Sequence, residues 1–160
     1  MIISPERKAQ LNRNLMLFFT GFSRFSSDIQ KTTQKDMADK ERQLLEMLSL
    51  VDEAEKVLTT KTDLNEFGRL LDYTWKLKRG ISSGISTDSI DGLYAKGIEA
   101  GALGGKLLGA GGGGFLLFYV EEDKREAVAK AMEDLLYVPF QFENSGTRVI
   151  HYTAEMYEKR

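Results

Sequence analysis

The sequence predicts an α+β fold of the ferredoxin-like, split-βαβ kind, with an antiparallel sheet and extra helices. Short apolar runs typical of strands alternate with longer segments in which apolar residues recur at the helical period. Their order along the chain is strand, helices, strand, strand, helix, strand, so the extra helices fall in the first crossover. The 160 residues suit one domain, because no linker or internal repeat divides them.

The first strand is expected near residues 14–20, an apolar run rich in aromatic residues that ends at Gly21. Ser23 is suited to cap a helix that begins at Arg24. Residues 36–58 then form a long amphipathic pattern. Its expected buried face consists of Leu44, Leu45, Met47, Leu48, Val51, Val57 and Leu58.

Two more helices are expected before the next strand. One spans about residues 62–79, where Asp63 and Glu66 have the spacing of a capping box, and it ends at Gly80. Its expected apolar face consists of Leu64, Phe67, Leu70, Leu71 and Trp75. The other spans residues 86–100, with a Ser-Thr pair at its start as the N-cap.

The second half of the chain supplies the remaining strands. They are expected at residues 106–108 and 115–120, and a helical pattern over residues 121–136 follows. Two short strands are expected to close the fold, near residues 138–142 and 147–152, around an Asn-Ser-Gly turn.

Composition argues against several classes of protein. The formal net charge is −2 and no basic stripe appears, so nucleic acid is not an expected partner. The chain has no cysteine, which excludes disulfides and thiolate metal sites, and His151 is its only histidine. No apolar run approaches the roughly 18–20 residues that span a membrane. Because the start also lacks the order of a signal peptide, we expect a cytoplasmic protein.

The segment with the most chemical content is Gly109-Ala110-Gly111-Gly112-Gly113-Gly114, where five of six residues are glycine. Such a run removes Cβ atoms, so that backbone N–H groups can approach an anion closely and φ can be positive. We therefore predict that these six residues cradle phosphate. The alternative is a flexible hairpin tip, which needs only one or two glycines and gains nothing from the others, each costing about 0.5–1 kcal/mol in regular structure.

Context separates this loop from three known phosphate loops. Gly109, Gly111 and Gly114 match the dinucleotide pattern G-x-G-x-x-G, but a strand follows them where that motif needs a helix. A P-loop ends in Gly-Lys-Ser or Gly-Lys-Thr, whereas Phe115 follows here. The protein-kinase loop also lies between strands, but its His-Arg-Asp catalytic loop is absent from the sequence.

The run Lys106 to Gly114, KLLGAGGGG, resembles the C-terminal glycine motif of the GHMP kinases. That family includes galactokinase, homoserine kinase, mevalonate kinase and phosphomevalonate kinase. The segments that resemble the lead-in to this motif are 84–87, 90–91 and 100–104. The segments FFTGFSRFSSDI (18–29), WKLKR (75–79) and PFQFENSG (139–146) most resemble the bacterial D-glycero-D-manno-heptose 7-phosphate kinase branch.

The resemblance implies the substrate-side lobe of an ATP- and Mg²⁺-dependent kinase that acts on a sugar or sugar phosphate. In these kinases an N-terminal lobe carries a Gly-Leu-Gly-Ser-Ser loop and the acidic metal ligand, and no such run exists here. Residues 1–160 are thus expected to form a single domain like the C-terminal lobe, with the N-terminal ATP-binding lobe absent. ATP and Mg²⁺ are expected to bind only when that lobe is supplied. We expect the chain alone to be inactive, because phosphoryl transfer depends on positioning and charge stabilisation.

Residues 109–114 are the expected cofactor-binding residues, and four more are expected to bind substrate: Arg24, Lys106, Arg79 and Ser86. Arg24 follows a strand-to-helix junction, where an anion can be held, and its alternative is a surface arginine. Lys106 precedes the glycine loop, and its alternative is a solvated strand end. Arg79 also complements the helix dipole, and Ser86 is also a cap. No catalytic residue or metal ligand is identified.

The second functional hypothesis is a free-standing ferredoxin-like domain that binds a small anionic ligand or dimerises. Separation from an N-terminal lobe should leave an apolar, glycine-rich face uncovered. We therefore expect self-association, including a homodimer, or a mobile loop in the isolated chain.

Overall fold

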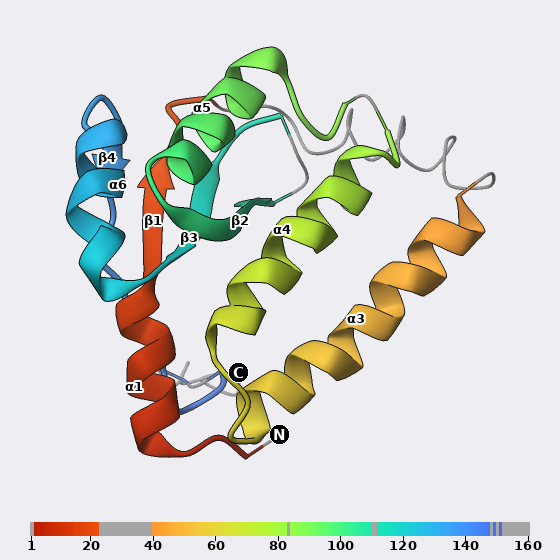
Figure 1. Ribbon diagram of the computed structural model, residues 1–160, viewed down its shortest axis with the longest axis vertical. Helices are drawn as coiled ribbons and strands as arrows, with labels where there is room; N and C mark the ends of the chain where they lie inside the picture. Colours follow the sequence, from red (N-terminus) through yellow and green to blue (C-terminus); the bar gives the residue numbers. More distant parts are fainter. Residues whose placement is uncertain are drawn as a thin grey trace, which may run out of the picture.

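The computed structural model describes residues 2–22, 40–82, 84–109, 112–147, 149 and 151 (Figure 1). Its sheet has the order β2-β3-β1-β4, and every pair of neighbours is antiparallel. The strands are β1 (Leu15–Phe19), β2 (Ala102–Leu108), β3 (Phe115–Val120) and β4 (Leu136–Tyr137). Because β3 is antiparallel to both β1 and β2, those two strands run parallel on either side of it. This arrangement is the split βαβ unit, which confirms the predicted fold class.

Three helices form the crossover from β1 to β2, namely α3 (Glu41–Thr59), α4 (Asn65–Arg79) and α5 (Asp88–Glu99). Helix α4 packs along β2, α3 packs on α4, and α5 contacts β2 from another side (Figure 1). None of the helices in the described ranges is long and apolar enough to cross a membrane.

Glycines in β2 and α4 allow these two elements to approach closely. A Cβ on Gly104 would overlap the carbonyl oxygen of Gly68 and lie 2.8 Å from the backbone nitrogen of Asp72. A Cβ on Gly68 would lie 2.7 Å from the ring of Tyr119. The glycines of β2 therefore serve helix–sheet packing, which is a separate purpose from that of the loop after it.

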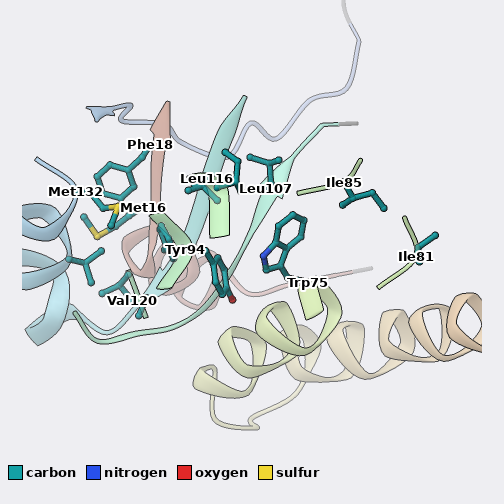
Figure 2. Close-up of a cluster of buried hydrophobic side chains, with 14 residues drawn as sticks. Met16, Phe18, Trp75, Ile81, Ile85, Tyr94, Leu107, Leu116, Val120 and Met132 are labelled. Carbon is teal, nitrogen blue, oxygen red and sulfur yellow. The ribbon is translucent and has the colours of Figure 1, made fainter. Parts of the chain in front are cut away.

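The core lies on both faces of the sheet, because successive side chains of each strand point to opposite sides. Leu116, Phe118 and Val120 belong to one cluster and Tyr119 to the other. Figure 2 shows the first cluster, in which Trp75 lies near Tyr94 with ring centroids 6.2 Å apart. Ile81 and Ile85 are buried in the same cluster. They anchor the segment that follows α4, and that segment borders the glycine loop.

The predicted buried face of α3 is partly wrong. Leu48 and Val51 are 64% and 59% exposed, whereas Leu50 is only 8% exposed. Helix α3 rests on α4 through the side that carries Leu44 and Met47, and the rest of the apolar pattern faces outward. Leu45 is also exposed, and Val57 and Leu58 are buried as predicted. Because α3 packs on one neighbouring helix, only part of its broad apolar pattern is buried.

The helix termini agree with the predictions in part. The hydroxyl of Thr87 accepts a hydrogen bond from the backbone of Ile90, which confirms the predicted cap of α5. Asp63 accepts from the N–H of Asn65 before α4. The carboxylate of Glu66 pairs with Arg69, so the expected capping box does not form.

The two ends of the described chain differ most from the prediction. An unpredicted helix, α1 (Pro5–Asn14), precedes β1, with Ser4 as its N-cap. The expected helix over 121–136 is divided into a short 3₁₀ helix, η1 (Glu122–Lys124), and α6 (Arg125–Ala131). Within the expected strand 147–152, the described residues 147, 149 and 151 adopt no strand structure.

The expected strand at 138–142 does not form, because the chain leaves the sheet after β4. Val138 donates one more hydrogen bond to Leu17, at 2.8 Å, and Pro139 has no N–H to continue the ladder. Beyond Pro139, the side chain of Asn12 in α1 binds the backbone in place of β1. It donates to the carbonyl of Phe140 and accepts from the N–H of Phe142.

Candidate functional site

The glycine loop joins β2 to β3 at one end of the sheet (Figure 1). Two other segments meet it there. One is the end of β1, residues 20–22, and the other is the connection between α4 and α5, residues 80–87. The site is therefore built from three parts of the sequence that the split βαβ topology brings together.

Backbone hydrogen bonds fix the described part of the loop. Gly112 donates its N–H to the carbonyl of Ile85 at 3.1 Å, and Gly114 donates to the carbonyl of Phe22 at 2.9 Å. Thr20 donates both its N–H and its hydroxyl to the carbonyl of Gly114. The N–H groups of Gly112 and Gly114 are therefore used by the fold, so the predicted phosphate cradle does not draw its donors from these two residues.

Backbone geometry explains the glycines at four positions of the loop. Gly109, Gly112 and Gly114 have φ values of +102°, +71° and +110°, which other residues rarely adopt. Gly113 lies so close to the end of β1 that a Cβ would stand 2.5 Å from the carbonyl oxygen of Phe22. In the described part of the loop, glycine is therefore required by backbone conformation or close packing at Gly109, Gly112, Gly113 and Gly114.

Three of the predicted site residues lie outside the described part of the chain. They are Arg24, Ala110 and Gly111. The helix expected from Arg24 lies there too, so the prediction that Arg24 binds a substrate phosphate stays a prediction.

The structure brings the predicted residue Lys106 to the loop together with Lys78. The Nζ of Lys78, in the last turn of α4, donates to the carbonyl oxygen of Gly109 at 3.3 Å. Burial lowers the pKa of the Lys78 ammonium, and the nearby positive charge of Lys106 lowers it further. Lys78 therefore contacts the first residue of the loop, and Lys106 is close enough to influence its charge.

Arg79 and Ser86 meet at a carboxylate that sequence reasoning missed. The Nη2 of Arg79 lies 2.8 Å from Oδ2 of Asp91, and the hydroxyl of Ser86 donates to Oδ1 at 2.6 Å. Asp91 thereby ties the end of α4 and the loop after it to the first turns of α5. Arg79 and Ser86 thus lie close together through this internal carboxylate, and their binding of substrate stays a prediction.

An open hollow of about 510 Å³ lies over the Arg79 pair. It is lined by Lys76, Arg79, Gly80, Ser82, Ser86, Thr87, Asp88 and Asp91. The hydroxyl of Ser82 is buried and has no hydrogen-bond partner among the described residues. The hollow is polar and is continuous in sequence with the segment that supports the glycine loop.

A second carboxylate, Asp72, lies about two turns before Arg79 on the same side of α4 and also contacts α5. Tyr94 donates its hydroxyl to Asp72 at 2.8 Å, and Lys76 approaches the other oxygen at 2.6 Å. Burial and the hydrogen bond to Asp72 raise the pKa of Tyr94 far above its ordinary value, so this phenol stays protonated. The spacing from Asp72 to Lys76, four residues along the helix, is a signal that identifies this pair in the sequence.

These groups are suited to bind and orient an anion. A rigid turn, two ammonium groups and a guanidinium lie at the ends of α4, β1 and β2. Among the described residues, no three His, Asp or Glu side chains are grouped so that they could hold a metal ion. We therefore derive no step through a metal held by these residues.

Comparison with known proteins gives a family and several relatives. The family model of the GHMP kinases C terminal matches residues 50–138. The D-glycero-alpha-D-manno-heptose 7-phosphate kinase of Campylobacter jejuni is 29% identical over 157 residues, which are 92% of this chain and 46% of that protein. The mevalonate kinase of Pyrococcus abyssi is 35% identical over 89 residues, covering 54% of this chain and 26% of that protein.

Solved structures have the same fold. The crystal structure of the Methanococcus jannaschii mevalonate kinase superposes with a TM-score of 0.70 at 24% identity, covering 86% of this chain and 42% of that one. The chain thus spans about half the length, or less, of the relatives that it matches.

Proposed function

This chain belongs to the GHMP kinase family, as a domain of the C-terminal type, and we propose from this premise that it forms one wall of a kinase active site. The observation that carries the proposal is the position of the glycine loop. The loop lies within the matched region, and Gly112 and Gly114 hydrogen-bond to the segment after α4 and to the residues after β1. It faces the same end of the fold as the ammonium groups of Lys78 and Lys106.

The proposed reaction is transfer of a phosphoryl group from ATP, with Mg²⁺, to a sugar or sugar phosphate. Kinases of this family use ATP, and the heptose 7-phosphate kinase relative aligns with nearly all of this chain. We propose a similar acceptor here, which makes the substrate a sugar that already carries a phosphate.

The proposed role of this domain is to support and to position. The loop at 109–114 is proposed to support a phosphate loop from an N-terminal lobe through backbone contacts. Lys106, Arg79 and Ser86, together with Arg24, are the proposed contacts to substrate. Arg79 and Ser86 act as a unit with Asp91, because both bind its carboxylate. The ATP loop and the metal ligands are assigned to the N-terminal lobe, so this domain alone is proposed to be inactive.

Complementation with a foreign lobe tests this proposal. The N-terminal lobe of the Campylobacter jejuni relative would be fused to this chain, and ADP release measured with ATP, Mg²⁺ and a panel of sugar phosphates. We expect turnover by the fusion with a heptose phosphate and none by the 160-residue chain. Turnover by the chain alone would contradict the proposal that this domain is inactive without an N-terminal lobe. A folded fusion that is inactive with every sugar phosphate would contradict the proposed kinase role.

A further inference from the structure

Two lysines from different elements lie near the start of the glycine loop, and the charge of one lowers the pKa of the other. Lys78 comes from the last turn of α4, and its Nζ lies 3.3 Å from the carbonyl oxygen of Gly109. Lys106 comes from β2, where it pairs in register with Leu117, three residues before Gly109. Both side chains are half-buried.

Neither ammonium has a carboxylate partner within the part of the chain that the structure describes. The ion pairs there involve Arg69, Lys76, Arg79 and Lys124. The contrast within α4 is informative, because Lys76 and Arg79 are each matched with an aspartate while Lys78 between them is not. Among the described residues, the two ammonium groups thus have each other's positive charge nearby and no carboxylate, an arrangement that a bound anion would stabilise.

We propose that Lys78 and Lys106 together bind a phosphate group at the entrance of the glycine loop. The inference rests on the proposed function and extends it, since it adds Lys78 of α4 to the proposed contacts with phosphate. The shared chemistry is a phosphate with two or more negative charges. It comes either from the phosphate chain of a nucleotide or from the phosphate ester of a sugar.

The geometry suits this role. The carbonyl of Gly109 is a neutral partner, and a phosphate oxygen is a stronger acceptor for an ammonium, so Lys78 can turn from one to the other. Binding of a dianion neutralises both lysines at once and removes their mutual repulsion. Arg79 is less available for this task, because leaving Asp91 would abandon an ion pair and disturb Ser86.

Titration of the 160-residue chain with two anions tests the proposal. Pyrophosphate stands for the nucleotide phosphates, and mannose 6-phosphate stands for the sugar ester. Binding would be measured from NMR shifts of the glycine amides in the chain and in its Lys78→Gln, Lys106→Gln and Lys96→Gln variants. We expect saturable binding of at least one anion, weakened about tenfold by either of the first two substitutions. Lys96→Gln, at an exposed position of α5, is the matched control and should change the affinity less than twofold.

The pattern over the two anions identifies the source of the phosphate. If only the binding of pyrophosphate depends on Lys78, the site binds the nucleotide phosphates. If only the binding of mannose 6-phosphate depends on Lys78, the site binds the sugar phosphate. Equal binding by the wild type and Lys78→Gln, or no saturable binding by the wild type, would overturn the proposal. Lys78→Arg keeps the charge and should restore binding, which separates loss of charge from loss of fold.

The fusion enzyme separates this inference from the proposed function. If the fusion is active but Lys78→Gln leaves both the KM for ATP and the KM for the sugar phosphate unchanged, only the lysine site fails. If anion binding depends on Lys78 but the folded fusion has no kinase activity, only the kinase role fails.

Discussion

The N–H of Gly114 donates a 2.9 Å hydrogen bond to the carbonyl oxygen of Phe22, so the glycine loop is anchored to the end of β1. The adjacent Gly113 fits against the same carbonyl and leaves no room for a Cβ, which would lie 2.5 Å from the oxygen. Backbone against backbone cannot yield as a side chain does. Residues 113 and 114 of the loop therefore have a structural role, in addition to the proposed binding role of the loop.

Gly113→Ala should disrupt the contact between the loop and the backbone of Phe22. We expect a loss of about 1–3 kcal/mol in the free energy of unfolding, the range of overpacked positions, measured by urea denaturation. Amide signals of Thr20 and Phe22 should shift in NMR spectra of the variant. A variant as stable as the wild type, with those signals unmoved, would show that the contact is not maintained in solution.

Helix α5 offers a matched pair of glycines. A Cβ on Gly97 would lie 2.5 Å from the ring of Phe118, whereas nothing lies within 4 Å of a Cβ on Gly92. Gly97→Ala should lower the free energy of unfolding by about 1–3 kcal/mol through overpacking. Gly92→Ala should raise it by about 0.5–1 kcal/mol, because alanine favours the helix. Thermal unfolding of both variants checks this, and equal melting temperatures would contradict the packing described here.

The sheet was predictable because its central strands are short apolar runs with clear boundaries. Leu15–Phe19 and Phe115–Val120 need no knowledge of the tertiary structure to be identified. The short strand β4 is different, since only two of its residues pair with β1 before Pro139 interrupts the ladder. The start of helix α1 has a sequence signal that predicts it, namely Ser4-Pro5, an N-cap followed by a proline at N1.

The outward face of α3 leads to a third prediction. Leu48 is 64% exposed and Leu50 is 8% exposed, although the amphipathic pattern suggested the opposite. Leu50→Ala should cost about 2–4 kcal/mol of unfolding free energy, as buried leucines do, while Leu48→Ala should change it by less than about 0.5 kcal/mol. Urea denaturation of the two variants distinguishes them, and a larger loss for Leu48→Ala would mean that this face is covered in solution.

The Arg79–Asp91–Ser86 unit supports a fourth prediction. Asp91→Asn removes the charge that Arg79 pairs with and one acceptor of Ser86. Because the pair is about one-third exposed, we expect a modest loss of about 1 kcal/mol in the free energy of unfolding. In the fusion enzyme the KM for the sugar phosphate should rise. Glu99→Gln, at the exposed far end of α5, is the control and should leave both quantities unchanged.

The candidate site was predictable in its loop and less so in its side chains. A run of glycines is visible in one dimension, and so is a lysine that precedes it. Asp91 as a partner of Arg79 is not visible, because this pair forms only when α4 packs beside α5. Asp72 differs, since its i,i+4 spacing to Lys76 can be recognised in the sequence. The choice between Lys78 and Arg79 is a matter of helical rotation against β2, which the composition of a last turn does not reveal.

The lowered pKa of Lys78 gives a pH-dependent prediction. The folded chain holds this proton less tightly than the unfolded chain, whose lysine titrates near its ordinary value of 10.5. Between the lowered pKa and 10.5 the unfolded state binds more protons, so stability should rise with pH through that window. The unfolding free energy of the wild type should therefore gain on that of Lys78→Met as pH increases toward 10.5. Saturating pyrophosphate should narrow the window from its lower edge, because a bound anion favours the charged lysine and so raises its pKa in the folded state. A difference between wild type and variant that is flat with pH would contradict the burial of this ammonium.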